Sequence, residues 1–186
     1  MKPECFIIRK EYFDHVSWLH GIGHTGRVMA LVWELCHLTG LESQKPAAYC
    51  AAFIHDMSRQ HDGICKLHGS LAAKMKLPQF RDFFLAQGLS ETELKAVGNA
   101  VHWHSLTEEA DMNHEHYQVI SLLKDADALD RIRLGPHDLD ARFLRFTESH
   151  QLIKPARKLF MKSALKQEKR AVFYHELLGK ILKSFK

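Results

Sequence analysis

The sequence lacks the features that mark membrane, secreted and zinc-ribbon proteins. No apolar run reaches the roughly 18 residues that a membrane-spanning helix needs. The opening stretch, MKPECFIIRKEYF, has no signal-peptide apolar core, and none of the four cysteines belongs to a CxxC pair. We therefore expect a cytoplasmic protein without a membrane span, with reduced thiols in place of disulfides or a zinc–thiolate site.

Strand signals are also scarce. There is no useful alternation of apolar and polar residues, and no Asn-Gly or Asp-Gly turn joins two apolar runs. Apolar residues instead recur at spacings of three and four, as they do between Val28 and Leu38. With typical helix and loop lengths, the pattern predicts an all-α bundle of about seven to nine helices. The segments we expect to be helical include 28–38, 46–55, 90–104, 117–134, 139–146, 155–165 and 171–185.

Several helix ends are signalled by particular residues. Thr39-Gly40 and Gly135-Pro136 are typical helix stops, and Pro46 suits a first helical turn. Ser90 and Glu93 have the spacing of a capping box, in which each side chain bonds the backbone of the other residue.

Charge is distributed unevenly along the chain. Residues 154–186 hold ten Lys or Arg and two acids, a formal +8, and since the whole chain carries +4, the rest carries −4. The last helix, 171–185, could present its lysines to solvent, or attract a polyanion or an acidic membrane. We do not expect nucleic-acid binding, because no zinc-finger spacing or RNA-recognition signature accompanies this basic stretch.

Fourteen histidines lie singly or in close pairs beside apolar segments. This distribution is typical of a folded site and not of a compositional metal-binding tail. Distant segments each offer metal-ligand side chains, namely His24, His55-Asp56, His68, the pair His102 and His104, and the group Asp125, Asp127 and Asp130. Imidazole suits Fe, Mn, Ni or Zn, and carboxylate suits Mn, Fe or Mg.

Two of these segments have a setting that favours metal binding. Neighbouring helical residues point about 100° apart, so His55 and Asp56 can reach one metal only beside a helix C-terminus. Asp127 lies between two alanines after the mostly apolar run 119–123. A carboxylate on such a face must be paired, hydrogen-bonded or metal-bound. Each residue alone is more typical of a core histidine or a surface ion pair, and it is their combination that predicts a site.

The order of these motifs resembles the HD-domain superfamily of metal-dependent phosphohydrolases over residues 19–130. The resemblance implies that His24, His55, Asp56 and Asp127 bind one metal. It further implies that His68 and His104 add a second ion, with His102 as a competitor for the place of His104. The metal is expected to be Fe, Mn, Ni or Zn, with Mg as a further candidate, at one or two ions per chain.

The chemistry implied by the resemblance is hydrolysis of a phosphomonoester or phosphodiester by metal-activated water. The expected substrate is a nucleotide or another small phosphorylated metabolite. Asp56 could orient or deprotonate the water as well as bind metal, and Lys124 and Arg27 are catalytic candidates that would contact phosphate. Further substrate contacts are expected from His20, Arg59 and His102.

Two other functions fit the same residues. The ligand set also resembles that of the diiron oxygenases built on this scaffold, which cleave C–C or C–P bonds. A non-enzymatic nucleotide sensor is the third reading.

We expect one domain over 1–186, with a metal-site core at 19–130 and a helical extension at 137–186. Substrate, metal identity and oligomeric state stay open at this point.

Overall fold

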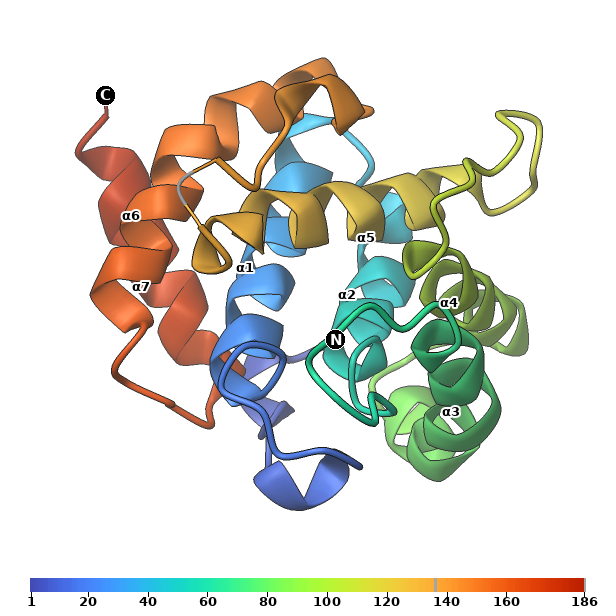
Figure 1. Cartoon of the computed structure of the whole chain (residues 1–186). Coiled ribbons are helices and arrows are strands. Elements are labelled where there is room, and N and C mark those ends of the chain that lie inside the picture. The colour runs from blue at the N-terminus through green and yellow to red at the C-terminus, as the bar shows by residue number, and fades with distance from the viewer. Residues whose placement is uncertain (136, 186) are drawn as a thin grey trace.

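In the part that the computed structural model describes, residues 1–135 and 137–185, all regular secondary structure is helical, apart from one isolated bridge between Ile7 and Arg170. The prediction of an all-α chain is confirmed, and the count within this part falls in the predicted range (Figure 1). The α-helices are α1 (Ile22–Leu38), α2 (Lys45–Ile54), α3 (His68–Ala86), α4 (Glu91–His104), α5 (Tyr117–Leu129), α6 (Ile153–Ser163) and α7 (Ala171–Lys183).

Helix α2 is the most enclosed element. Every residue from Ala47 to Ile54 is buried, and the helix contacts α1, α3, α4 and α5. Four alanines and Cys50 have small side chains, so the neighbouring helices can approach α2 closely. Pro46 lies in the first turn, as predicted, where its missing N–H costs no helical hydrogen bond. The end of α2 is therefore fixed deep inside the molecule.

Helices α3 and α4 pack against each other along one side of α2 (Figure 1). Their closest approach needs Gly69, because a Cβ there would lie 2.3 Å from the carbonyl oxygen of Val101. The predicted capping box is confirmed at the start of α4, where Glu93 N donates to Ser90 Oγ and Ser90 N donates to Glu93. This packing brings the first residue of α3 beside the last residue of α4.

Helix α5 crosses α1 and α2, and α6 and α7 cover the far side of α1 (Figure 1). Gly26 makes the contact with α7 possible, since a Cβ at this position would meet the ring of Tyr174 at 2.2 Å. Among the described residues, no helix is both long and apolar enough to cross a bilayer.

Two predicted helical segments differ from the structure. The helix predicted at 139–146 is wrong: that segment holds only the 3₁₀ turn Ala141–Phe143. The reason is Asp125, whose carboxylate accepts hydrogen bonds from the backbone N–H groups of Arg145 and Phe146 and so holds this chain extended. Helix α5 ends at Leu129 and continues as the 3₁₀ turn Asp130–Arg133. Pro136, part of the predicted stop, lies outside the described residues.

One long helix had no predicted counterpart. Helix α3 contains Pro78 in its interior and many polar residues, so its apolar spacing is weak. Helix α1 begins at Ile22, six residues before the predicted start, and includes Gly23 and Gly26. Both glycines are tolerated there because close packing requires a small residue, which outweighs their poor helix propensity.

Candidate metal centre

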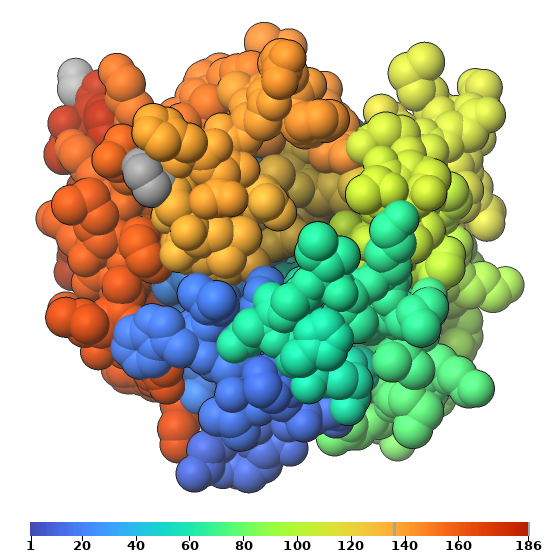
Figure 2. Space-filling model, viewed as in Figure 1, coloured from blue at the N-terminus to red at the C-terminus, as the bar shows by residue number. Residues whose placement is uncertain are grey.

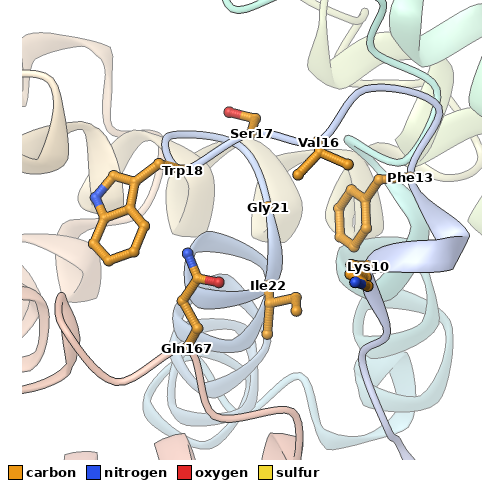
Figure 3. Close-up of a pocket in the computed structure, with 8 residues that line it drawn as sticks. All are labelled: Lys10, Phe13, Val16, Ser17, Trp18, Gly21, Ile22 and Gln167. Carbon is orange, nitrogen blue, oxygen red and sulfur yellow. The ribbon is translucent and has the colours of Figure 1, made fainter.

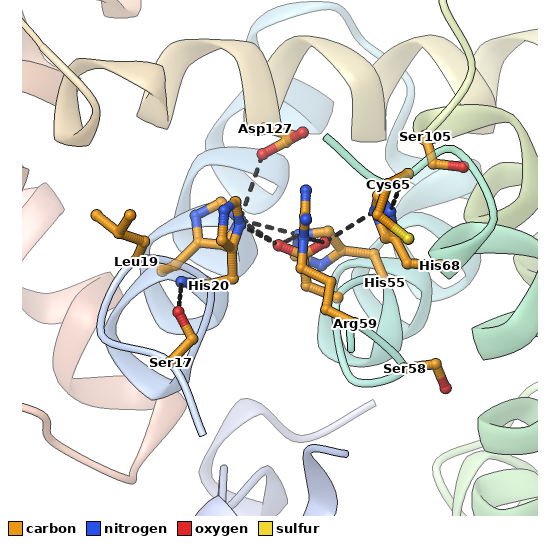
Figure 4. Close-up of polar contacts among 12 residues, drawn as sticks. Ser17, Leu19, His20, His55, Ser58, Arg59, Cys65, His68, Ser105 and Asp127 are labelled. Atoms are coloured by element: carbon orange, nitrogen blue, oxygen red, sulfur yellow. Dashed lines mark hydrogen bonds and ion pairs between the residues drawn. The ribbon is translucent and has the colours of Figure 1, made fainter. Parts of the chain in front are cut away.

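The six residues predicted as metal ligands converge on one buried place. They come from the ends of five helices: His24 in the first turn of α1, His55 and Asp56 just after α2, His68 at the start of α3, His104 at the end of α4, and Asp127 near the end of α5. His55, His68 and Asp127 face a common centre in Figure 4. Segments far apart in sequence thus supply one cluster of imidazole and carboxylate groups.

One part of the cluster, the His24 half, consists of His24, His55, Asp127 and the Oδ2 atom of Asp56. His24 Nε2 lies 3.0 Å from His55 Nε2. It also lies 3.3 Å from Asp56 Oδ2 and 3.3 Å from Asp127 Oδ1. Both histidines are fully buried, whereas the Asp127 side chain is 27% exposed.

The other part, the His68 half, consists of His68, His104 and the Oδ1 atom of Asp56. His68 Nε2 lies 2.9 Å from His104 Nε2 and 3.0 Å from Asp56 Oδ1. His104 Nε2 lies 3.6 Å from the same oxygen. Asp56 therefore has one carboxylate oxygen facing each pair of histidines.

The tautomers of these histidines follow from their hydrogen bonds. The Nδ1 atoms of His55, His68 and His104 each meet a backbone carbonyl oxygen three residues earlier in the chain. A carbonyl only accepts, so each Nδ1 carries the proton and each Nε2 presents a lone pair. With both imidazoles neutral, the His68 half places two Nε2 lone pairs and a carboxylate oxygen face to face as acceptors.

Such an arrangement of acceptors fits a cation. Two nitrogen ligands about 2.1 Å from a metal and at right angles to it would lie about 3 Å apart, close to the separations in both halves. Asp127 Oδ1 is a buried oxygen without a hydrogen-bond donor, and it points at the His24 half. Within the described part of the chain, three overlapping groups could each hold a metal ion, namely His20–His24–Asp56, His24–His55–Asp127 and His55–Asp56–His104.

The protonation states also suit metal binding. Burial lowers the pKa of His55 to about 3 and lowers the pKa of His104, so both are neutral ligands at neutral pH. Burial opposes ionisation of Asp56, but the surrounding histidines, His55 foremost, hold its carboxyl pKa well below the usual range. Burial and Arg133 act against the charge on His24, yet its contacts with the carboxylates of Asp127, Asp130 and Asp56 raise its pKa to about 9. His24 Nε2 thus lies where three acceptor atoms, on His55, Asp56 and Asp127, converge.

A supporting carboxylate lies directly behind His24. Asp130 Oδ2 is 2.8 Å from His24 Nδ1, and Arg27 donates two hydrogen bonds to the same carboxylate, at 2.6 and 2.9 Å. A carboxylate in this position fixes the tautomer and orientation of a ligand histidine. The sequence pattern grouped Asp130 with the metal-ligand candidates. In the structure, Asp130 instead contacts the Nδ1 atom of the predicted ligand His24. The "DADALD" spacing contained a signal for this role, since Asp130 is three residues, about one helical turn, after Asp127.

The same contact places Arg27 away from the predicted phosphate position. Its Nε and NH2 atoms both donate to Asp130, and its guanidinium lies over the ring of Phe160 at 5.1 Å. These contacts favour a supporting role for Arg27 over the catalytic role that the sequence suggested. Arg133, which sequence reasoning missed, faces the predicted ligand Asp127. Its NH1 atom is buried, lacks a hydrogen-bond partner and lies 3.8 Å from Asp127 Oδ1.

His20 and Arg59, predicted substrate contacts, both bind Asp56. His20 Nδ1 lies 2.9 Å from Asp56 Oδ2, and burial lowers the pKa of His20. Arg59 donates from Nε to Asp56 Oδ1 at 3.0 Å and from NH1 to the carbonyl oxygen of Gly63. Arg59 thereby ties the ligand carboxylate to the loop that contains His61 and Asp62. That second His-Asp pair, which is followed by Gly63 in a polar loop, lies outside the cluster.

His102 and Lys124 occupy different places around the centre. His102 Nδ1 pairs with Ser70 Oγ at 2.9 Å and does not join the cluster, which favours His104 as the ligand. Lys124 Nζ donates to the carbonyl oxygens of Leu106 and Glu108, and burial lowers its pKa. Lys124 thus holds the loop after α4 and lies at the edge of the cluster.

A cavity of about 410 Å³ leads to the centre. His104 and Asp127 line its inner end, and Lys124, Arg131 and Arg145 line its walls together with Glu109, Asp138 and Asp140. The surface is hollowed there, between the gold and orange chain around residues 124–145 and the yellow-green chain around residues 104–109 (Figure 2). Its size falls within the few hundred to about 1,000 Å³ typical of small-molecule sites.

The chain matches no protein-family model, no curated protein and no solved structure. The resemblance to the HD-domain superfamily therefore stays a prediction. What the structure adds is that buried His and Asp groups drawn from distant segments could hold a metal ion.

Proposed function

We propose that this protein is an HD-type phosphohydrolase that uses two divalent metal ions to cleave a phosphate ester of a nucleotide or another small metabolite. The observation that carries the proposal is the position of the Asp56 carboxylate. One oxygen faces His24 and His55, and the other faces His68. A carboxylate between two sets of histidine lone pairs is the arrangement that a two-metal site requires.

His24, His55 and Asp127 would hold one ion, His68 and His104 the other, and Asp56 would bridge them. When bound, such an ion pair supplies Lewis acidity toward phosphate oxygens and a water that ionises near neutral pH. Asp130 keeps the imidazole of His24 in the orientation that presents Nε2 to the centre. Asp127 is ionised because, although burial opposes it, contact with His24 lowers its pKa well below the usual range.

The cavity supplies the substrate side of the proposal. Lys124, Arg131 and Arg145 line an opening that ends at His104 and Asp127, and each forms an ion pair with an acid: Glu109 for Lys124 and Arg145, and Asp138 for Arg131. Cations in this position offset the charge on non-bridging phosphate oxygens. The acids on the same walls accept hydrogen bonds from hydroxyl or amino groups of the remaining substrate, as ribose and base edges would offer. A nucleotide or a phosphorylated metabolite of similar size fits this combination.

The test begins with metal analysis of protein purified without chelator, followed by a phosphatase screen with the metal found. We expect two equivalents per chain and metal-dependent release of phosphate or of a nucleotide product. The variant His55→Ala should lose activity, and the matched control His61→Ala should keep it, since His61 belongs to the second His-Asp pair outside the cluster. One metal equivalent in fully loaded protein, or equal activity in the two variants, would contradict the proposal.

A diiron oxygenase is the second candidate, because four histidines and two carboxylates also suit redox-active iron. Oxygen consumption separates the two functions. Hydrolysis predicts full activity with Mn²⁺ in the absence of O₂. Substrate-dependent O₂ uptake by the iron-loaded protein, with no anaerobic turnover, would favour the oxygenase.

A further inference from the structure

The outer side of α6 carries an unusual combination of exposed side chains. Met161 and Leu165 are 70% and 90% exposed and lie four residues apart. At 100° per residue, the exposed residues of α6 and the following turn fall within about half of the helical circumference, with these two apolar residues near its middle. The basic residues on both sides of them are Lys154, Arg157, Lys158, Lys162 and Lys166.

No acid offsets this charge on α6 itself. Residues 154–185 contain only Glu168 and Glu176. Glu168 is neutralised by Arg170, whose NH2 atom lies 2.9 Å from its Oε2 atom, and Glu176 belongs to α7. The opposite side of α6 is buried through Pro155, Ala156 and Leu159, so the helix is fixed in place and its charged side faces outward.

A second exposed apolar group flanks α6. Trp18 and Val16, which are 55% and 77% exposed, lie in the loop that also carries His20. Trp18 lines a small cavity with Phe160 and Gln167, which places the indole beside α6 and the turn after it. A neighbouring cavity of about 210 Å³ is lined by Lys10, Val16, Trp18 and Gln167 (Figure 3). The loop around Trp18 therefore borders α6 and the turn after it at Phe160, Ala164 and Gln167.

We propose that this basic–apolar face, formed by the exposed side of α6 and the loop around Trp18, docks the protein on an anionic lipid surface. Lysine and arginine are attracted to acidic headgroups, and exposed apolar side chains between them enter the headgroup–acyl boundary. An indole suits the same boundary, because it has an apolar body and one polar N–H. A nucleic-acid backbone would use the cations but leave Met161 and Leu165 in water.

Cosedimentation of the full chain with vesicles tests the proposal. The probes are vesicles of phosphatidylcholine alone and vesicles with about 30 mol% phosphatidylglycerol, the anionic component that basic residues are expected to recognise. We expect binding to the anionic vesicles only, weakening as salt is raised. Each basic side chain near the surface contributes roughly a five-fold factor in partitioning, so K158E/K162E should bind at least 25-fold less.

The apolar contribution has its own variants. M161S/L165S should reduce binding to anionic vesicles by about ten-fold, since two apolar side chains no longer enter the boundary. The matched control is K74E/M75S on α3, where Met75 is 58% exposed, and this variant should bind as the unaltered protein does. All substituted side chains are exposed, so unchanged thermal melting shows that each variant is folded.

Three outcomes would overturn the proposal. One is equal binding to both kinds of vesicle or to neither. Another is an equal loss in the α6 variants and in the α3 control. The third is tight binding of a DNA or RNA duplex that M161S/L165S leaves unchanged, which would assign the basic side chains to nucleic acid.

Discussion

The two halves of the candidate metal centre share Asp56 but are supported differently. In the His24 half, His24 is held by the carboxylate of Asp130, which Arg27 orients in turn. In the His68 half, both imidazoles are held only by backbone carbonyls within their own segments. A carboxylate raises the basicity of a ligand histidine more than a neutral carbonyl does. The His24 half should therefore bind its ion more tightly, and the His68 half should exchange its ion more readily.

The largest effect is expected from Asp56→Asn, because this side chain belongs to both halves. The amide keeps the shape but removes the charge, and it turns an NH₂ group toward one pair of lone-pair nitrogens. Affinity for both ions should fall by more than the roughly 100-fold that loss of a supporting partner costs. Metal analysis after dialysis measures this directly. Retention of one tightly bound ion would mean that the two halves are independent.

The next largest effect is expected from variants that each remove a ligand from one half only. His68→Ala should remove one metal equivalent and leave the other, because the His24 half keeps His24, His55, Asp127 and Asp56. His55→Ala should release the tighter ion. Titration calorimetry with Mn²⁺ distinguishes the two variants. If His68→Ala abolished binding of both ions, the two halves would form a single unit with no difference in strength.

Asp130→Asn tests the support of His24. The amide can still accept one hydrogen bond but no longer carries charge, so His24 becomes a weaker ligand. We expect a loss of roughly 10- to 100-fold in affinity for the tighter ion only. The readout is competition with a chelator of known affinity. An equal change at the weaker ion would show that Asp130 acts on the whole centre.

The smallest change in metal binding is expected from Gly69→Ala. A Cβ here would meet a backbone carbonyl of α4, so α3 must move away and the distance between His68 and His104 must increase. Gly26→Ala is the matched control, since its Cβ would meet Tyr174 on α7, away from both histidines. Each variant should lose about 1–3 kcal/mol of unfolding free energy through overpacking. Only Gly69→Ala should weaken the second ion, as measured by metal titration beside thermal melting.

Much of the centre could be predicted because its residues are close to helix ends that leave signals in the sequence. His55-Asp56 follows an apolar run, and Asp127 stands among alanines and leucines, where an unpaired carboxylate would be costly. The structure brings both together with His24, His68 and His104, and it leaves the second pair, His61-Asp62, in a loop.

The supporting contacts could not be predicted, because they depend on tertiary packing. Asp130 and Arg27 are in contact although they are more than 100 residues apart in the sequence. No periodic pattern in the sequence predicts a contact over that distance. Arg133 was not predicted, because it follows the DADALD motif in the sequence. It reaches the centre only because the 3₁₀ turn after α5 directs its side chain inward. The wrong helix at 139–146 has a similar origin, since Asp125 binds that chain from a distant element.

The placement of the ligands at helix ends also sets an order in time. A ribosome makes the chain from the N-terminus, so the segments that carry the ligands emerge in chain order. Asp56, His68 and His104 are all present once α4 has been made, whereas the His24 half waits for Asp127 on α5. The half with the weaker support is thus the first to have its full set of ligands, and the tighter half is completed last, when α5 crosses α1.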